Sequence, residues 1–166
     1  AADPDTTTPT VEDSFEVVTY TGNGGTQSID TGFKPDLIWV KQRAGSAANH
    51  LIFDSIRGAY KQIMPNTTSS GVDRTSVDKG VTSFDSNGFT VKDTSAGDYE
   101  INGPNGGTYS GDGSYVAWCW KAGDHDDNLP QINTEGTIDS VVSVNDASGF
   151  SIVKWTGTGS NATVGH

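Results

Sequence analysis

The sequence predicts an all-β fold, an antiparallel β-sandwich with at most one short helix. Short runs of Val, Ile, Phe, Tyr and Trp alternate with polar stretches, and the 166 residues include 21 Gly and 6 Pro. This composition is typical of short strands joined by many turns. Only 33% of the residues are hydrophobic, but the length is sufficient for one domain with its own core.

The first part of the chain predicts an arm followed by two core strands. Residues 1–13, AADPDTTTPTVED, offer few side chains to bury and predict an extended linker or arm. A β-sandwich domain is expected over residues 14–123. Its first strands are Phe15–Thr21 and Leu37–Lys41, which are expected to pair, and their adjacent apolar residues suggest cover on both faces.

The middle of the chain contains one weak helical signal and one strong hairpin signal. After a short run at Leu51–Phe53, only Ser55–Met64 shows helical spacing, and Gly58 within it limits any helix to a turn or two. Val81–Val91 predicts a β-hairpin, because Asn87-Gly88 tolerates positive φ at the turn and phenylalanines flank it.

A long polar loop separates the hairpin from a tryptophan-rich strand. Ser95–Ser114 is so rich in Gly, Asn and Asp that a surface loop is expected. Tyr115–Lys121 alternates in the manner of a strand. Its two faces are Val116, Trp118 and Trp120, and Tyr115, Ala117 and Cys119. The face with two tryptophans is expected at the centre of the core.

The last part of the chain repeats its beginning. Residues 124–136 read as an acidic linker, and residues 137–166 as a strand segment that opens a second repeat or docks on a neighbour. Phe150–His166 aligns without a gap on Phe15–Thr31, an offset of 135 residues, with five identities. Strands before glycine turns also resemble one another by chance. A lone strand would leave an unpaired edge, which a longer chain or another protomer should complete.

Charge and cysteine content restrict the classes of partner. The net charge of −11 repels phosphate backbones and anionic membrane surfaces, so neither nucleic-acid binding nor membrane insertion is expected. No stretch has the length and apolarity of a bilayer span, and no signal peptide is evident. Cys119 is the only cysteine, which argues against a disulfide framework or a zinc site. No cofactor is expected.

No motif predicts catalysis. The glycine-rich stretches at 21–25 and 102–107 precede neither a helix nor a Lys-Ser/Thr pair, so they read as turns. Several carboxylates could serve glycosidase chemistry, but the sequence places no two of them together. They are Asp36, Asp54, Asp98, Glu100 and Asp112. No histidine lies in a recognisable triad motif, and the chain is not expected to be an enzyme.

Two weaker binding signals remain as candidates. Asp124, Asp126 and Asp127 could donate oxygens to Ca²⁺, although a solvated acidic turn explains them better. Aromatic rings beside polar loops could stack on sugars or could cover the edge of the sandwich. The glycan-binding candidates are Tyr99, Tyr109 and Asp112, with Tyr60 as a further aromatic residue.

Four motifs in order carry a resemblance to a known family: GFKPDLIWVKQR at 32–43, LIFDSIRGA at 51–59, TSFDSNGFTV at 82–91 and YVAWCWKAG at 115–123. The sequence resembles an uncharacterised tandem β-sandwich domain family of marine phage (cyanophage-type) virion appendage proteins, such as tail fibres and spikes. The strand at 151–157 and Val164–His166 also fit its pattern. The resemblance implies a concanavalin-like or jelly-roll-like sandwich, a virion or extracellular location, and no catalytic residues.

The functional expectation is a virion structural module, part of a tail fibre, spike or capsid-attached fibre, that contributes to attachment to a host-surface glycan. Its partners would be other copies of itself and other virion proteins. One alternative is a purely architectural decoration or filament subunit that binds no receptor. A second alternative is a polysaccharide-degrading enzyme on the same fold.

Overall fold

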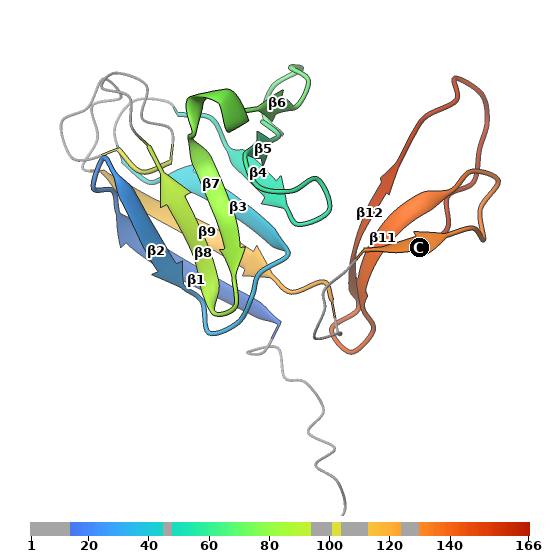
Figure 1. The fold of residues 1–166 in the computed structure, drawn as a ribbon, viewed down its shortest axis with the longest axis horizontal. Helices are drawn as coiled ribbons and strands as arrows, with labels where there is room; N and C mark the ends of the chain where they lie inside the picture. The colour runs from blue at the N-terminus through green and yellow to red at the C-terminus, as the bar shows by residue number, and fades with distance from the viewer. Residues whose placement is uncertain (1–13, 45–47, 94–100, 104–112, 124–129) are drawn as a thin grey trace, which may run out of the picture.

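The computed structural model describes residues 14–44, 48–93, 101–103, 113–123 and 130–166. Within them the chain forms an antiparallel β-sandwich followed by a separate three-stranded sheet (Figure 1). The strands are β1 (Phe15–Thr21), β2 (Thr26–Asp30), β3 (Leu37–Gln42), β4 (Leu51–Asp54), β5 (Lys61–Gln62), β6 (Val72–Asp73), β7 (Gly80–Asp85), β8 (Gly88–Lys92), β9 (Ser114–Trp120), β10 (Gln131–Asn133), β11 (Ser140–Asn145) and β12 (Phe150–Trp155).

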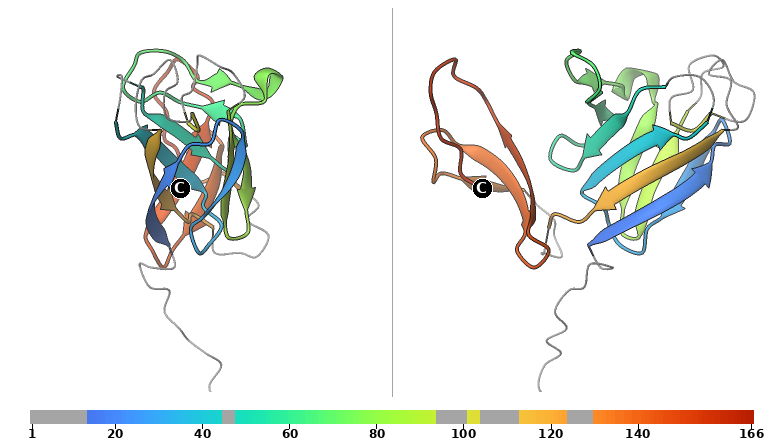
Figure 2. Two further views of the ribbon diagram at one scale, coloured as in Figure 1. Left: turned by 90° about the vertical axis from the view of Figure 1, so that its left-hand side faces the viewer. Right: turned by 180° about the vertical axis from the view of Figure 1, so that it is seen from behind.

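Two sheets face each other across the core of the sandwich, as Figure 2 shows. One has the order β1-β9-β3-β4 and the other β2-β8-β7, while β5 and β6 form a small two-stranded sheet beside β4. All neighbouring strands in these sheets pair antiparallel. The predicted all-β sandwich is confirmed.

The core contains side chains from both sheets, and most of them have no exposed surface. Alternate residues of β3 and β9 point inward, which is the pattern of strands with one face on a core. The buried cluster comprises Phe33, Ile38, Val40, Leu51, Phe53, Val81, Phe89, Val91, Ile101, Tyr115, Ala117 and Cys119.

The inward face of β9 is the opposite of the expected one. Tyr115, Ala117 and Cys119 are buried between the sheets, whereas Trp118 and Trp120 are only partly buried on the outer face. The prediction that the tryptophans lie at the centre of the core was wrong. The small Ala117 and Cys119 side chains leave room for the phenylalanines of the facing strands, and two tryptophans there would overfill the core.

The position of β1 also differs from expectation. Its partner is β9, from Phe15 opposite Trp120 to Thr21 opposite Ser114, and β9 in turn separates it from β3. The expected pairing of the first strand with the Leu37 strand was wrong. Cover on both faces of β1 was also wrong, because Val17 on its outer face is 42% exposed.

The stretch with helical spacing, Ser55–Met64, contains no helix. The backbone has positive φ at Gly58 (91°) and at Tyr60 (67°), values that a right-handed helix excludes. The chain turns there and continues into β5. Within the described ranges the helical structure is a single 3₁₀ turn, η2 (Thr75–Val77).

The hairpin of β7 and β8 is confirmed, with Phe84 opposite Phe89. Its turn residues are Ser86 and Asn87, however, and Gly88 already belongs to β8, opposite Asp85. Gly88 meets a different requirement. A Cβ atom there would lie 2.0 Å from the backbone oxygen of Ile29, so only glycine allows β2 to approach β8 this closely.

The C-terminal sheet has the order β10-β11-β12, and β10 lies within the region expected to be a linker. The strand β12 is not alone, because it pairs antiparallel with β11 along its whole length. Phe150 stacks on Trp120 of the sandwich with ring centroids 6.0 Å apart. Asn145 Nδ2 donates hydrogen bonds to Ser14 Oγ (3.4 Å) and to the Lys121 backbone oxygen (3.3 Å).

No helix in the described segments is long and apolar enough to cross a bilayer.

Candidate functional site

Ile101–Gly103 is a buried segment within the predicted surface loop. Ile101 and Asn102 have no exposed surface, and Ile101 belongs to the core cluster. The segment therefore divides the loop into residues 94–100 and residues 104–112, both outside the described residues. Ile101–Gly103, together with the side chains that hold it, is called the loop anchor below.

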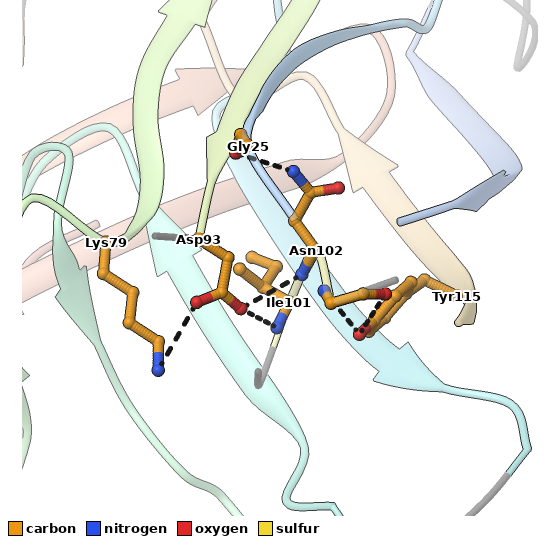
Figure 3. Close-up of polar contacts among 7 residues, drawn as sticks. Gly25, Lys79, Asp93, Ile101, Asn102 and Tyr115 are labelled. Carbon is orange, nitrogen blue, oxygen red and sulfur yellow. Dashed lines mark hydrogen bonds and ion pairs between the residues drawn. The ribbon is translucent and has the colours of Figure 1, made fainter. Parts of the chain in front are cut away.

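Asn102 is the centre of the loop anchor and uses both ends of its amide, of which Figure 3 shows the end that bonds to Gly25. Its Nδ2 donates hydrogen bonds to Asn23 Oδ1 and to the Gly25 backbone oxygen, both at 2.9 Å. Its Oδ1 accepts a hydrogen bond of 2.7 Å from Gln27 Nε2. The backbone oxygen of Asn102 accepts a further bond from the Gly24 amide at 2.8 Å. Asn102 thereby fixes the turn between β1 and β2 to the loop.

The carboxylate of Asp93, directly after β8, lies against the same segment. Its Oδ2 is 3.5 Å from the backbone nitrogens of both Ile101 and Asn102, which donate to it, and its Oδ1 is 3.6 Å from Lys79 Nζ. Asp93 has no exposed surface and Lys79 is 3% exposed. A buried carboxylate requires compensation of this kind, from a cation and from amide donors.

Two stacked tyrosines hold the backbone on the other side. Tyr20 donates a hydrogen bond of 2.7 Å to the Ile101 oxygen, and the Tyr115 hydroxyl accepts one of 2.9 Å from the Gly103 amide. Their rings stack with centroids 5.1 Å apart. Burial raises the pKa of Tyr115 to about 12 and that of Tyr20 well above its usual value. Both hydroxyls therefore stay neutral hydrogen-bonding groups.

Gly22 brings the two ends of the second loop segment to the same place. Its amide donates to the Gly113 oxygen at 2.7 Å, and a Cβ on Gly22 would lie 2.1 Å from the Gly103 oxygen. Residues 104–112 therefore begin and end at the turn after β1, and residues 94–100 run between Asp93 and Ile101. The loop anchor holds both ends of each segment.

The polar groups of the loop anchor form hydrogen bonds with one another and with backbone atoms, an arrangement that supports loops.

In the described part of the chain, no group of three or more His, Cys, Asp or Glu side chains could hold a metal ion. The calcium candidates Asp124, Asp126 and Asp127 lie outside the described residues, as do the glycan candidates Tyr99, Tyr109 and Asp112. Asp98 and Glu100 lie outside them too.

The other acidic candidates have structural partners. Asp36 is fully buried, and its carboxylate accepts bonds from the Ala122 and Gly123 amides (2.9 and 3.1 Å) and from Ser55 Oγ (2.7 Å). It therefore joins the start of β3 to the ends of β4 and β9. Asp54 accepts bonds from the Arg57 backbone nitrogen (2.7 Å) and from Arg57 Nε (2.5 Å).

Tyr60, the remaining aromatic candidate, lies on the turn before β5. Its hydroxyl donates to Asp78 Oδ1 at 3.1 Å, and its backbone nitrogen donates to the Val81 oxygen at 2.8 Å. Asp78 also pairs with Lys92, and these hydrogen bonds hold the pKa of Asp78 below its usual value. Tyr60 thus joins the β5 turn to β7 through its backbone amide.

The arrangement of the sheets places the chain in the class of antiparallel all-β sandwich proteins. Within that class, the chain belongs to the family described as Domain of unknown function (DUF7483), whose model matches residues 10–166. The match covers both the sandwich and the C-terminal sheet. Searches of curated proteins and of solved structures found no match.

Proposed function

We propose that the domain is a non-enzymatic module of a virion appendage, a tail fibre, spike or capsid-attached fibre, and that it contributes to attachment to host-surface glycan through residues 94–100 and 104–112. The observation that carries the proposal is the loop anchor. It fixes both ends of both segments with hydrogen bonds from Tyr20 of β1, Tyr115 of β9, Asp93 after β8 and the turn between β1 and β2. Binding residues are commonly carried by loops on a rigid scaffold, because loops can vary without exposing the core.

The chemistry of the two segments supports a sugar ligand. Tyr99 lies in the first segment, and Tyr109 and Asp112 lie in the second. Tyrosine rings stack on the apolar faces of sugars, and a carboxylate accepts hydrogen bonds from their hydroxyl groups. Each contact is weak, and several copies on one particle would convert weak contacts into useful avidity.

A glycan array with host envelope polysaccharides tests the proposal on a tetravalent form of the chain. Tyr109→Ala and Tyr99→Ala should each weaken binding by roughly 2- to 10-fold, the value of one aromatic contact, without changing the thermal midpoint. Ile132→Ala is the matched control, because Ile132 is 75% exposed and lies in the C-terminal sheet. Equal signals from the parent chain and both tyrosine variants would contradict the assignment to these loops.

Asn102→Ala tests the anchor itself. The variant removes the hydrogen bonds of the Asn102 amide to Asn23, Gly25 and Gln27, whereas Gln27 Nε2 keeps its bond to the Thr21 oxygen and the Gly25 oxygen keeps the Asp93 amide. The loss should cost about 1–3 kcal/mol of unfolding free energy and should also weaken glycan binding. Glycan binding that stays at the parent level in a measurably destabilised Asn102→Ala chain would show that the anchor does not position the binding loops.

The architectural role remains the second candidate, because Trp155 on β12 is 55% exposed and such a strand suits contact with a neighbour. Ordered contacts at every lattice point of a particle map would favour it over adhesion. Incubation of the purified chain with host envelope polysaccharide tests the enzymatic alternative. Release of reducing ends that is lost on substitution of Asp98, Glu100 or Asp112 would replace the proposal with a hydrolase.

A further inference from the structure

A cavity of about 260 Å³ lies between the sandwich and the C-terminal sheet. Figures 1 and 2 show β12 on the side of the sandwich that carries β4 and β5. The two units touch where Phe150, at the start of β12, stacks on Trp120, and the cavity lies toward the other end of that strand. Its lining includes Asp54, Arg57 and Ile63 of the sandwich and Ile152, Lys154 and Trp155 of β12.

The cavity gathers exposed apolar surface from both units. Trp155 is 55% exposed and Ile63 is 38% exposed, and they are two of the five exposed large hydrophobic side chains among the described residues. Exposed apolar side chains that converge on one hollow, rather than lying singly, mark a binding site. An indole also offers a flat apolar face with an N–H donor at its edge, which suits a sugar ring with C–H groups on its faces and hydroxyls on its rim.

The charged groups of the cavity are two cations and one carboxylate. Arg57 Nε donates to Asp54 Oδ2 at 2.5 Å, and Arg57 Nη2 donates to the Ile52 backbone oxygen at 3.3 Å. Asp54 therefore balances the charge of Arg57 and holds its guanidinium in place. Lys154 forms no ion pair with any described residue, so its ammonium group gives the cavity a net positive charge.

This local charge is opposite in sign to the net charge of the chain, which is −11. Charges farther away than a Debye length, about 8 Å in physiological salt, are largely screened, so the groups that line the cavity decide which ion it accepts. A wholly apolar ligand would desolvate Lys154 without pairing it. A bare inorganic anion would leave the surface of Trp155 and Ile63 uncovered.

We propose that this cavity binds a single anionic sugar residue, with the sugar ring on the face of Trp155 and its carboxylate or sulfate group paired with Lys154. A volume of about 260 Å³ lies just below the roughly 300–1,000 Å³ of sites for drug-sized ligands, which limits the occupant to about one ring. The site shares no residue with the loop anchor or with residues 94–100 and 104–112, so it does not depend on the function proposed above.

An NMR titration of the 166-residue chain tests the proposal, with D-glucuronate, D-glucose 6-sulfate and neutral D-glucose as probes. The anionic sugars should shift the amide signals of residues 57, 63 and 152–155, and the one that binds more tightly identifies the preferred anionic group. Glucose should bind roughly 3- to 10-fold more weakly than that probe, because it lacks the charge that pairs with Lys154.

Two variants separate the ring contact from the charge contact. Trp155→Ala should weaken the binding of all three sugars by roughly 2- to 10-fold. Lys154→Gln should lower the affinity for the anionic sugars to that for glucose and leave glucose binding unchanged. Lys61→Gln is the matched control, because Lys61 is an exposed lysine outside the cavity lining, and it should change each affinity by less than about twofold.

The thermal midpoints of the Trp155→Ala and Lys154→Gln chains should equal that of the parent, because both side chains are exposed. The Tyr109→Ala chain should bind these probes like the parent, which separates the cavity from the loops of the proposed function.

Several results would overturn the proposal. One is the absence of shifts at residues 152–155 with either anionic sugar, at concentrations well above the millimolar affinity expected of one sugar ring. Equal affinities for all three sugars that Lys154→Gln does not change would exclude the charge contact. Sodium sulfate that binds at the cavity as tightly as the anionic sugars would make it an inorganic-anion site. Shifts confined to the residues of the loop anchor would reject the cavity and leave the proposed function standing.

Discussion

At the scale of single residues, Cys119, Tyr20 and Tyr115 are ionisable groups that the core holds in their neutral forms. Burial raises the pKa of the Cys119 thiol to about 12, from an ordinary value near 9.0, and the nearby Glu16 carboxylate adds to this. Burial also raises the pKa of Tyr115 to about 12. Each of these side chains loses its proton far more readily in the unfolded chain than in the folded one.

These shifts predict that the protein loses stability in alkaline solution. A group whose pKa is higher in the folded state contributes full stability below its unfolded pKa and loses it as the pH rises toward the folded value. For Cys119 the window runs from about pH 9 to about pH 12. By pH 10.5 the loss from this thiol alone should be on the order of 1–2 kcal/mol.

Urea unfolding at pH 7.5 and pH 10.5 measures this loss in the parent chain and in Cys119→Ala. The variant should be less stable at pH 7.5, because it leaves a cavity, but its stability should fall less steeply with pH. The difference between the two slopes is the quantity to compare. Parallel curves for the two proteins would show that the thiol does not bind its proton more tightly in the folded state.

At the scale of elements, Gly88 decides how closely β2 and β8 can pair. Gly88→Ala places a methyl group 2.0 Å from the Ile29 oxygen, and the strands must separate or the hairpin must shift. Such overpacking should lower the free energy of unfolding by roughly 1–3 kcal/mol, measured by urea denaturation. Gly157→Ala is the control, since a Cβ there meets no atom within 4 Å, and its effect should stay within about 0.5 kcal/mol.

Elements built from local pairs could be predicted from the sequence, and elements built from distant pairs could not. The β7–β8 hairpin follows from two phenylalanines around a turn, all within a few residues. The pairing of β1 with β9 joins positions 15–21 to 114–120, and no local pattern records it. The inward face of β9 was misassigned for the same reason, because alternation shows that two faces exist but not which one meets the facing sheet.

The loop anchor shows the same limit for the candidate site. Polar composition predicted a surface loop over Ser95–Ser114, and it hid the buried Ile101 and Asn102. The partners of Asn102 lie up to 79 residues away along the chain, so its role appears only once β1, β8 and β9 are assembled. A lone Ile in a Gly- and Asn-rich stretch was the one available signal.

At the scale of the whole molecule, Trp120 is the joint between the sandwich and the C-terminal sheet. Its ring contacts both Phe15 of β1 and Phe150 of β12, and Asn145 adds hydrogen bonds to Ser14 and Lys121. Residues 14 and 121 also pair with each other through the Lys121 amide and the Ser14 oxygen, at 2.9 Å. The joint therefore combines one aromatic stack with a few polar contacts, which is a small interface for two units.

A joint of this size predicts that one substitution can release the C-terminal sheet without unfolding the sandwich. Phe150→Ala removes the ring that stacks on Trp120, and an aromatic pair contributes about 0.5–1.5 kcal/mol. The undocked fraction should therefore rise by roughly 2- to 10-fold. Small-angle scattering should report a larger radius of gyration, while the urea midpoint of the sandwich stays at the parent value.

The control is Ile132→Ala, a substitution at an exposed position of the same sheet, which should change neither the radius of gyration nor the urea midpoint. An unchanged radius of gyration in Phe150→Ala would place the strength of the joint in the Asn145 contacts, and a lowered midpoint would show that the two units unfold as one.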